Sequence, residues 1–359
     1  MSEIKIVRIE TGAPYDVKIG EDLLSKAGKT VAALCKKCER VALVSDDRVY
    51  PLYGGEVTRS LQEAGFEVLP FVFQNGEESK TTDTLVRLLN FLSEKGLSRT
   101  DAIAALGGGV TGDMAGLAAS LYLRGIPFIQ IPTTLLAAVD SSVGGKTAVD
   151  LPSGKNLVGS FYQPGAVLCD TRTLHSLSQE TFAGGMAETI KYGLLCDEAL
   201  FAELETFKHG DDLSPIVARC VELKNDYVAR DERDFGKRQF LNLGHTPAHA
   251  IEALSNFTVP HGQAVAIGMA VMARASEALG LAEEPFADRL CALLRAQELP
   301  TQTEFDAESM AKAALSDKKR RGGKITLVLP RKIGKCELYE IPTDELRDFF
   351  AAGLAERAE

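Results

Sequence analysis

The segment that decides the fold of the first half is AIAALGGGVTGDMAGLAASLYL, residues 102–123. Its first part, AIAALGGG (102–109), is an apolar run that predicts a buried strand, and its last part carries apolar residues at helical spacing. Between them, Gly107, Gly109 and Gly112 match G-x-G-x-x-G, a pattern that lets backbone N–H groups at a helix start contact a pyrophosphate. The pattern alone fits a structural turn equally well. The segment therefore predicts a strand–turn–helix unit that is a candidate nucleotide site.

The same alternation extends to both sides of this segment. Short apolar runs predict buried strands, and segments with helical spacing that end at glycine predict helices. The predicted strands are 41–46, 67–73, 127–132 and 166–170, and the predicted helices between them include 51–65 and 81–96. Strands that alternate with helices in this way predict a parallel sheet with helices on its faces.

Beyond about residue 178 the strand patterns nearly stop, and the second half is helical in period apart from a predicted hairpin at 325–341. With 359 residues, the chain has the length of two domains. We expect an α/β nucleotide-binding domain with a mainly parallel sheet over 1–178. We expect a mainly α-helical metal-binding domain, which contains the histidines described below, over 179–359.

The formal net charge of −10 disfavours nucleic acid or an anionic membrane as a partner, because phosphate groups need a basic surface. The first residues alternate like a strand without a signal-peptide pattern, and no apolar run is long enough to span a bilayer. The seven cysteines lack disulfide spacing. Cys35 and Cys38 form a C-x-x-C with no second pair, which favours packing over metal or redox chemistry. We expect a soluble, cytoplasmic protein.

The nucleotide interpretation lacks one expected feature. A dinucleotide fold usually places an acidic residue about 20 positions after the glycine pattern, where it binds the ribose hydroxyls. This chain has Pro132, Thr133 and Thr134 in that region. Asp46, at the end of an earlier predicted strand, could serve the ribose instead.

A second glycine-rich segment, SSVGGKT (141–147), invites comparison with a phosphate-binding P-loop. The comparison fails because the position six residues before Lys146 is Asp140 and not glycine. Lys146 and Lys155 then lie in what reads as a long loop. Lysines in such loops are commonly solvated, but the surrounding glycines and Asn156 favour contact with an anion.

Three of the five histidines fall close together. His245 and His249 are four apart and share a helix face, and His261 opens the next helical segment. The spacing is not H-E-x-x-H, so a zinc-protease motif has no support. Two histidines and a carboxylate with an open fourth position form a common catalytic zinc set, and Glu188, with Lys191 one turn further on, is the candidate carboxylate. Core or capping histidines are the alternative, but clustering in a His-poor chain favours metal binding or catalysis.

Further polar side chains precede the histidines. Lys224, Arg238 and Asn242 could converge on a carboxylate or phosphate, for which the Arg fork is well suited. The alternative is exposed helix charge. The basic run 317–323 reads as a solvated loop before the hairpin.

Taken in order, these segments resemble the 3-dehydroquinate synthase family of sugar phosphate cyclases. The resemblance runs from about residue 40 to about 330, and its long central block is highly specific. It is carried by ALGGGVTGDMAG, RGIPFIQIPTTLLAAVDSSVGGKTAVDLPSGKNLVGSFYQP, GGMAETIKYG, DERD followed by RQFLNLGHTPAHAIE, VPHGQAVAIGM and GKITLVLP. It implies an N-terminal NAD domain, a C-terminal helical metal domain and a shared cleft, with NAD and Zn²⁺ as cofactors and Co²⁺ as a substitute metal.

The resemblance also implies roles for individual residues. The zinc ligands it implies are Glu188, His245 and His261. The NAD contacts are Asp46, Gly76, Glu77, Lys80, Gly109, Val110, Thr111, Gly112, Asp113, Thr133, Thr134, Asp140, Lys146, Lys155, Thr173, Leu174, His175 and Ser176. The substrate contacts are Lys146, Lys155, Asn156, Lys191, Lys224, Arg238, Asn242, His249 and one of Lys318 and Lys319. Since the family is typically dimeric, Arg124 is expected to reach the substrate phosphate of a second subunit.

The implied reaction converts 3-deoxy-D-arabino-heptulosonate 7-phosphate into 3-dehydroquinate and phosphate, a step of the shikimate route. NAD takes a hydride, phosphate is eliminated, the same nicotinamide returns the hydride, and ring opening with an intramolecular aldol closes the carbocycle. The alternatives are another cyclase, of the 2-deoxy-scyllo-inosose synthase or sedoheptulose 7-phosphate type, a metal-dependent polyol dehydrogenase of the glycerol dehydrogenase type, and a non-catalytic homologue. The set that includes Lys224, Arg238, Asn242 and His249 favours a carboxylated substrate.

The chain departs from the family pattern at a few positions. Asp234 replaces a common Glu, Asn75 a frequent Asp, and Arg48 a smaller polar residue near the expected adenosine site. Pro247 and Ala248 replace an aromatic or aliphatic residue followed by glycine. None of these departures removes an implied metal ligand.

Overall fold

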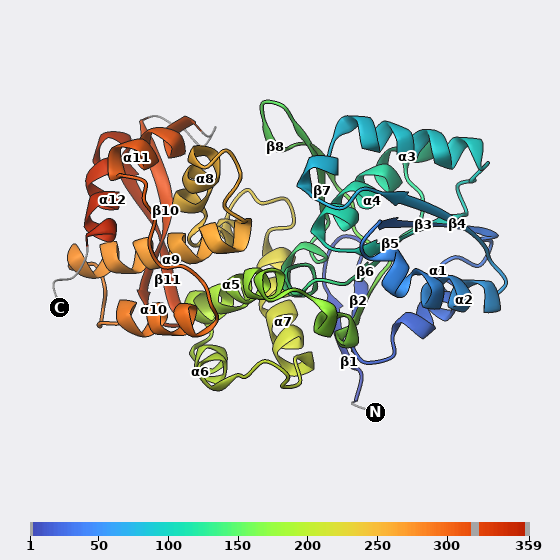
Figure 1. The fold of residues 1–359 in the computed structure, drawn as a ribbon, viewed down its shortest axis with the longest axis horizontal. Coiled ribbons are helices and arrows are strands. Elements are labelled where there is room, and N and C mark those ends of the chain that lie inside the picture. The colour runs from blue at the N-terminus through green and yellow to red at the C-terminus, as the bar shows by residue number, and fades with distance from the viewer. Residues whose placement is uncertain (1–2, 317–322, 356–359) are drawn as a thin grey trace. The chain divides into compact units, whose positions relative to one another are not determined.

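The computed structural model describes residues 3–316 and 323–355 and divides into two compact units (Figure 1). The first unit consists of Met1–Leu177 and Asp212–Arg233, and the second of Ser178–Asp211 and Asp234–Glu359.

The segment 212–233 was expected in the second domain but packs with the first unit. It contains α7 (Ser214–Arg230), which contacts β1 (Lys5–Ile9) and β2 (Tyr15–Gly20). The helical period of this segment predicts the helix, but period alone does not say which unit the apolar face covers.

A seven-stranded sheet forms the core of the first unit, in the order β1-β2-β9-β6-β5-β3-β4. All neighbours pair in parallel except β1 and β2, which are antiparallel. The five strands predicted from apolar runs are all present, and the α/β class with a mainly parallel sheet is confirmed. They are β3 (Arg40–Asp46), β4 (Glu67–Phe73), β5 (Ala102–Gly107), β6 (Phe128–Pro132) and β9 (Ala166–Asp170).

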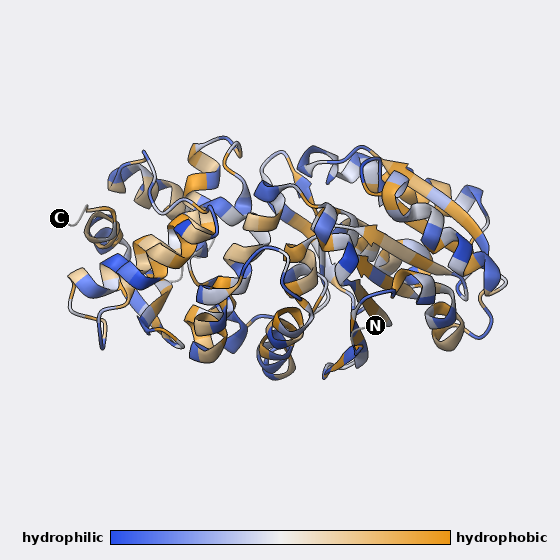
Figure 2. Cartoon of the chain, turned by 60° about the horizontal axis from the view of Figure 1, so that its bottom comes forward, coloured by the Kyte–Doolittle hydropathy of each residue, from blue (hydrophilic) through white to orange (hydrophobic). Residues whose placement is uncertain are grey.

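Helices cover both faces of the sheet, as alternate residues of β5 show. Ile103 and Ala105 belong to a core cluster with α3 (Thr82–Glu94) and α4 (Gly109–Leu121). Ala104 and Leu106 belong to a cluster on the other face, with the helices α1 (Ala27–Leu34) and α2 (Gly55–Glu63). A strand buried on both faces reads as one continuous apolar run, which is why the sequence predicts it well. Figure 2 shows hydrophobic colouring along such strands and mixed colouring along the helices.

The glycine-rich segment after β6 is not the long loop expected from sequence. It contains the antiparallel hairpin of β7 (Lys146–Leu151) and β8 (Gly154–Phe161). Glycine and polar residues hide the alternation of these strands. Gly159 has no side chain because a Cβ there would meet the backbone of Thr147 on the paired strand.

The second unit is mainly helical, as predicted. Its helix α9 contacts α5, α8, α10, α12 and β10, so it forms the centre of the unit. The predicted hairpin is present as β10 (Lys324–Lys332) and β11 (Lys335–Pro342). The helices are α5 (Gln179–Cys196), α6 (Glu198–Thr206), α8 (His245–Leu254), α9 (His261–Ala278), α10 (Ala287–Ala296), α11 (Ala307–Ser316) and α12 (Leu346–Leu354). Within the described part of the chain, no helix has the length and apolar character needed to cross a membrane.

Candidate metal centre and nucleotide site

Three metal-ligand side chains meet in the second unit. Glu188 lies within α5, His245 is the first residue of α8, and His261 is the first residue of α9. One ligand atom from each lies within 4.8 Å of the other two. The Nε2 atoms of His261 and His245 lie 3.2 Å and 3.6 Å from the same oxygen, Glu188 Oε1. The structure therefore brings the predicted trio together at one point.

A hydrogen-bond acceptor lies beside the Nδ1 atom of each histidine ring. His245 Nδ1 lies 3.1 Å from the backbone oxygen of Leu243, and His261 Nδ1 lies 3.4 Å from Glu252 Oε1. In the tautomer that carries the proton on Nδ1, each Nδ1–H donates to its acceptor, and Nε2 keeps a lone pair with which it can bind a metal. Histidine metal ligands are usually oriented in this way. Two imidazole nitrogens and one carboxylate oxygen fit a divalent metal such as Zn²⁺ that keeps an open position.

A close contact between backbones sets the distance from α5 to α9. A Cβ atom on Gly262 would overlap the backbone of Gly184 in α5. Glu188 follows Gly184 by one helical turn, and His261 precedes Gly262 directly. The absence of a side chain at Gly262 therefore lets Glu188 and His261 approach within hydrogen-bonding distance.

A second contact of this kind joins α9 to the start of α8. A Cβ atom on Gly268 would overlap the carbonyl oxygen of Gly244. Gly244 itself has φ +77°, a left-handed conformation that glycine adopts readily, and His245 follows it. The two contacts place the first residues of α8 and α9 beside the same face of α5.

The electrostatics of the trio also fit a cation. The Glu188 side chain is 1% exposed, and Lys191 Nζ lies 2.6 Å from its Oε2. Burial lowers the pKa of His245 to about 3. Burial also acts to lower the pKa of His261, but hydrogen bonds to the Glu188 and Glu252 carboxylates outweigh it and raise the pKa to about 10. Without a metal, the protonated ring of His261 carries a positive charge between the Glu188 and Glu252 carboxylates. A bound divalent cation would supply positive charge there instead.

Four predicted substrate contacts lie in the same unit as the trio: Lys191, Arg238, Asn242 and His249. Arg238 is buried in the short helix η7 (Lys237–Asn242), which leads into α8. The His249 ring packs edge-on against that of His245, with 5.6 Å between the ring centroids. The predicted contact from Lys318 or Lys319 falls outside the described residues.

Two departures from the family pattern, Pro247-Ala248 and Asp234, can be described from their local structure. Pro247 is the third residue of α8, where its missing N–H removes no intrahelical bond, because first-turn N–H groups have no intrahelical acceptor. Ala248 is fully buried beside Gly268. Asp234 has φ +61°, a conformation uncommon for a residue other than glycine.

In the first unit, the glycine pattern forms the predicted strand–turn–helix. β5 ends at Gly107 and α4 begins at Gly109. A Cβ atom on Gly112 would clash with the Gln130 side chain of β6, so the third glycine permits close packing of the helix on the sheet. The turn lies at the carboxyl end of β5, beside β3, where the strand order reverses. In open α/β sheets, ligands bind at this switch point.

Thr133 follows β6 at the same edge of the sheet. Its N–H donates to the Gly107 oxygen at 3.0 Å, and its side-chain hydroxyl is buried without a hydrogen-bond partner among the residues that the structure describes. Buried hydroxyls are normally hydrogen-bonded. This hydroxyl at the switch point is available to a ligand, which fits a bound dinucleotide. The Thr134 hydroxyl instead accepts the N–H of Ala137.

Asp46, the residue expected at the ribose, is buried and engaged within the protein. Its Oδ1 accepts the N–H groups of Arg48 and Val49 at 3.0 and 2.9 Å. Its Oδ2 accepts the Thr111 hydroxyl at 3.4 Å. The carboxylate thus ties the end of β3 to the first turn of α4. Its contact with a ribose stays a prediction.

Lys80 organises a second group of predicted contacts. Its Nζ lies 2.7 Å from Asp113 Oδ2 and 2.6 Å from Asn156 Oδ1. Burial acts to lower the pKa of Lys80, but the Asp113 and Glu77 carboxylates outweigh it and keep the pKa above its ordinary value. The ammonium group therefore stays charged and links α4 to the tip of the β7–β8 hairpin, where Asn156 has φ +55°.

Lys224 and Asp140 form another buried pair in this unit. Lys224 Nζ lies 2.6 Å from both the carboxylate Oδ1 and the backbone oxygen of Asp140. The other predicted cofactor contacts in the first unit are Gly76, Glu77, Val110, Lys146, Lys155, Thr173, Leu174, His175 and Ser176.

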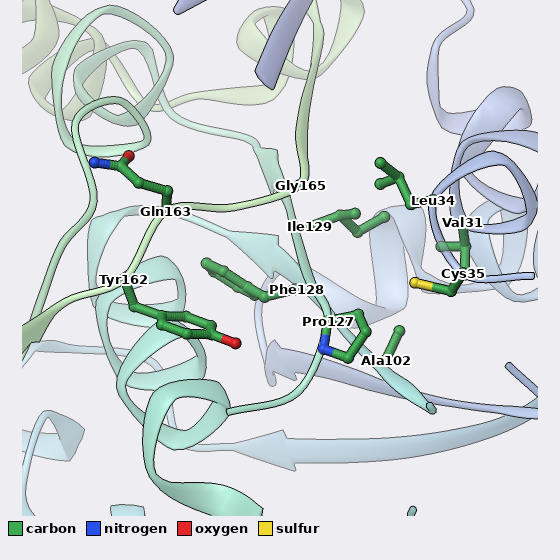
Figure 3. A pocket seen from close by; sticks show the side chains of 10 residues that line it. All are labelled: Val31, Leu34, Cys35, Ala102, Pro127, Phe128, Ile129, Tyr162, Gln163 and Gly165. Atoms are coloured by element: carbon green, nitrogen blue, oxygen red, sulfur yellow. The ribbon is translucent and has the colours of Figure 1, made fainter. Parts of the chain in front are cut away.

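A pocket of about 240 Å³ lies at the opposite edge of the sheet (Figure 3). Its lining is mainly apolar and comes from the end of α1, the starts of β5 and β6, and the segment after β8. The lining residues are Val31, Leu34, Cys35, Ala102, Pro127, Phe128, Ile129, Tyr162, Gln163 and Gly165. None of them is a predicted site residue. Burial raises the pKa of the Cys35 thiol and raises that of Cys38 to about 12, so both stay protonated at neutral pH, as packing residues do.

Sequence reasoning missed the groups that orient the ligands. Glu252 and the carbonyl of Leu243 are absent from the predicted site, although Glu252 follows His245 by two helical turns and so shares its face. That spacing was a readable signal. No pattern in the sequence indicates the packing roles of Gly262 and Gly268, because the residues that they contact lie far away along the chain.

Comparison with known proteins identifies the family to which the chain is similar. A family model described as 3-dehydroquinate synthase N-terminal matches residues 70–184, and one described as 3-dehydroquinate synthase C-terminal matches 185–320. A 3-dehydroquinate synthase from Caulobacter vibrioides is 48% identical over 334 residues, which cover 89% of this chain and 90% of that protein. One from Streptococcus sanguinis is 42% identical over 343 residues, which cover 94% and 96%.

Solved structures of similar fold include two sugar phosphate cyclases. One is a 2-deoxy-scyllo-inosose synthase complexed with carbaglucose-6-phosphate, NAD⁺ and Co²⁺, with a TM-score of 0.84, 28% identity and coverage of 98% of this chain and 100% of that one. Another is a 2-epi-5-epi-valiolone synthase from Streptomyces hygroscopicus with NAD⁺ and Zn²⁺ bound, with a TM-score of 0.84, 27% identity and 98% coverage of both chains. An iron-containing alcohol dehydrogenase, 16% identical with a TM-score of 0.62 and coverage of 98% and 99%, shares the fold alone.

The contact between Gly262 and Gly184 predicts an asymmetric effect of two alanine substitutions. Gly262→Ala forces a methyl group into the backbone of α5 and should lower the free energy of unfolding by about 1–3 kcal/mol. Because α5 and α9 then separate, Zn²⁺ affinity should fall by about tenfold or more, the scale of losses when ligand orientation is disturbed. Urea unfolding and a Zn²⁺ titration against a chromogenic chelator measure the two effects.

Gly184→Ala is the matched control, because a Cβ there comes no closer than 4.0 Å to Gly262. It should leave Zn²⁺ affinity unchanged. Equal effects of the two substitutions would contradict the assigned contact.

Proposed function

This chain belongs to the 3-dehydroquinate synthase family, and we propose that Glu188, His245 and His261 bind the divalent metal with which it converts 3-deoxy-D-arabino-heptulosonate 7-phosphate into 3-dehydroquinate and phosphate. This reaction is part of the shikimate route to chorismate and the aromatic amino acids. The observation that supports the metal site best is the convergence of three ligand atoms within 4.8 Å, with both histidines held through Nδ1.

The cofactors of the enzyme are NAD and a divalent metal, for which Zn²⁺ and Co²⁺ are the candidates. The two cyclase structures named above contain NAD⁺ with one of these metals. When bound, the metal lowers the pKa of a hydroxyl it contacts, and the nicotinamide takes up a hydride and later returns it. We assign NAD to the part of the chain up to residue 178 and the metal to residues 179–359.

The chain's own residues mainly hold and orient the substrate in this proposal. The buried guanidinium of Arg238 suits a carboxylate, which it can meet with two parallel hydrogen bonds. Lys191 Nζ lies 2.6 Å from Glu188 Oε2, so this side chain can contact a substrate that reaches the metal. Thr133, with its free hydroxyl at the end of β6, supports binding of NAD at the switch point. Positioning of a flexible substrate by such groups can supply a large part of the rate enhancement.

The roles assigned to Lys224, Asp140 and Lys80 rest on two buried ion pairs, Lys80–Asp113 and Lys224–Asp140, and that of Asn156 rests on the hydrogen bond it accepts from Lys80. Each pair holds a lysine of the first unit in a fixed place beside a carboxylate. A lysine held in this way can bind an anionic substrate group with little loss of side-chain entropy. We propose that Lys224 and Asn156 contact substrate, and that Asp140 and Lys80 contact NAD.

The comparisons separate the proposed reaction from its alternatives. Curated relatives that cover most of the chain at 41–48% identity are 3-dehydroquinate synthases, whereas the inosose and valiolone synthases are 27–28% identical. The alcohol dehydrogenase likeness shows the fold alone. Arg238 adds a group suited to the carboxylate of the heptulosonate.

We further propose a cytoplasmic homodimer. The seven cysteines are all free, as is usual in a reducing compartment. For the dimer, Leu121, Leu123, Leu157 and Phe161 expose 40–50% of their surface around the end of α4 and along β8. A hydrogen bond of 2.8 Å between Ser120 and Ser160 shows that these segments are adjacent. Within the described residues, β8 pairs with β7 alone, so its outer edge is open to a second subunit.

The central test is a turnover assay. With catalytic amounts of NAD and Zn²⁺, the enzyme should release phosphate and form dehydroquinate in equal amounts, while NADH does not accumulate. His261→Ala should lose bound Zn²⁺ and lower kcat/KM by more than about 100-fold, because it removes a ligand. His209→Ala, a change at an exposed histidine of the same unit, should keep both. Accumulation of one NADH per substrate, or normal Zn²⁺ content in His261→Ala, would refute the proposal.

The dimer proposal predicts the effect of surface charge. Leu123→Glu combined with Phe161→Glu should dissociate the dimer, because two charges would then be buried in an apolar interface. Sedimentation velocity measures the mass. Leu279→Glu, at an exposed leucine of the second unit, should leave the mass unchanged. A wild-type monomer, or an intact dimer in the double variant, would contradict the interface.

Arg124 tests the contact across the dimer separately. Arg124→Ala should keep the dimer and lower kcat/KM by about 10–100-fold, the scale of a lost charge-assisted hydrogen bond. An unchanged kcat/KM would remove Arg124 from the site.

A further inference from the structure

Glu252 is a buried carboxylate beside the metal site that is not one of the three ligands. It lies on α8, and its side chain is 4% exposed. Burial of a carboxylate is costly unless the group is paired or hydrogen-bonded. Its Oε1 lies 3.4 Å from Nδ1 of His261, the ring atom on the side away from Glu188. The carboxylate thus contacts the one ring nitrogen that a bound metal would leave unused.

The connection from α8 to α9 holds Glu252 and His261 together. Asn256 and Phe257 both have positive φ, 51° and 61°. Such conformations cost about 1–3 kcal/mol each for residues other than glycine and persist only where the surroundings enforce them. Phe257 N–H donates to the backbone oxygen of Glu252 at 2.7 Å. The backbone of the turn is therefore hydrogen-bonded to Glu252, the residue whose side chain contacts His261.

The two histidine ligands are oriented by acceptors of different strength. The Nδ1 atom of His245 meets a neutral backbone carbonyl, and its side chain is only 12% exposed, so packing also restrains the ring. The His261 side chain is 35% exposed and is restrained less by packing. A carboxylate acceptor both fixes such a ring and makes its other nitrogen a better donor to metal.

We infer that Glu252 is a positioning residue that holds His261 Nδ1–H and so presents Nε2 to the metal. The inference rests on the proposed metal site and deepens it. It differs from a purely structural role for Glu252, which would stabilise the fold without acting through His261.

Metal affinity of the metal-free protein tests this inference without an activity assay. Glu252→Gln keeps the shape but removes the charge, and Zn²⁺ affinity, measured by competition with a chromogenic chelator, should fall by about 10–100-fold. Glu277→Gln is the matched control, because Glu277 lies four turns along α9 and accepts the N–H groups of Phe286 and Ala287 instead. It should bind Zn²⁺ like the wild type.

A double-mutant cycle shows whether Glu252 acts through His261. In a His261→Ala background, which already binds Zn²⁺ weakly, adding Glu252→Gln should cause no further loss. A full additional loss in that background would overturn the inference. Wild-type affinity in Glu252→Gln would overturn it as well.

Two further readouts keep the test decisive. If Glu252→Gln does not fold, as judged by its thermal unfolding, Glu252→Asp keeps the charge but withdraws the carboxylate by one methylene. It should also weaken Zn²⁺ binding, and unchanged affinity would then overturn the inference. If His261→Ala alone binds Zn²⁺ like the wild type, the metal site itself fails, and this result is distinct from failure of the role of Glu252.

Discussion

The proposed metal site depends on how closely α9 can approach α5 and α8. At Gly262 and Gly268 the neighbouring backbone leaves no room for a side chain. The helices can therefore approach until their backbones are in contact. The contacts bring the first residues of α8 and α9 against the middle of α5. Three candidate ligand atoms from three helices then fall within 4.8 Å of one another. Packed interiors tolerate little displacement, so the ligand geometry follows from the helix spacing.

The first unit uses close packing in a similar way at the candidate nucleotide site. The glycine turn after β5 lies at the switch point of the sheet, and Gly112 allows α4 to pack directly on Gln130 of β6. The buried pairs Lys80–Asp113 and Lys224–Asp140 then place charged groups that would be costly to bury alone. Rigid packing thus supports polar groups in both units, which is what an enzyme that must orient a flexible sugar phosphate requires.

Much of this arrangement could be predicted from the sequence, and the limits have physical reasons. Strands such as β5 are continuous apolar runs because both of their faces are buried. The candidate metal site is recognisable because three of the five histidines cluster, but only the family resemblance separates His249 from the proposed ligands. The β7–β8 hairpin was missed because its glycines and polar residues hide the alternation. The position of α7 was missed because helical period does not say which unit a helix covers. Glu252 shares a helix face with His245, which was a readable signal, but its contact with His261 on another helix was not.

Zinc-edge anomalous diffraction from crystals of the Zn²⁺-loaded protein tests the central claim most directly, because it locates the metal without reference to turnover. The account predicts one strong peak in the second unit, at about 2.0–2.2 Å from a Glu188 oxygen and from Nε2 of both His245 and His261. A peak bound elsewhere, for example at Cys35 and Cys38, with none at the trio, would contradict it.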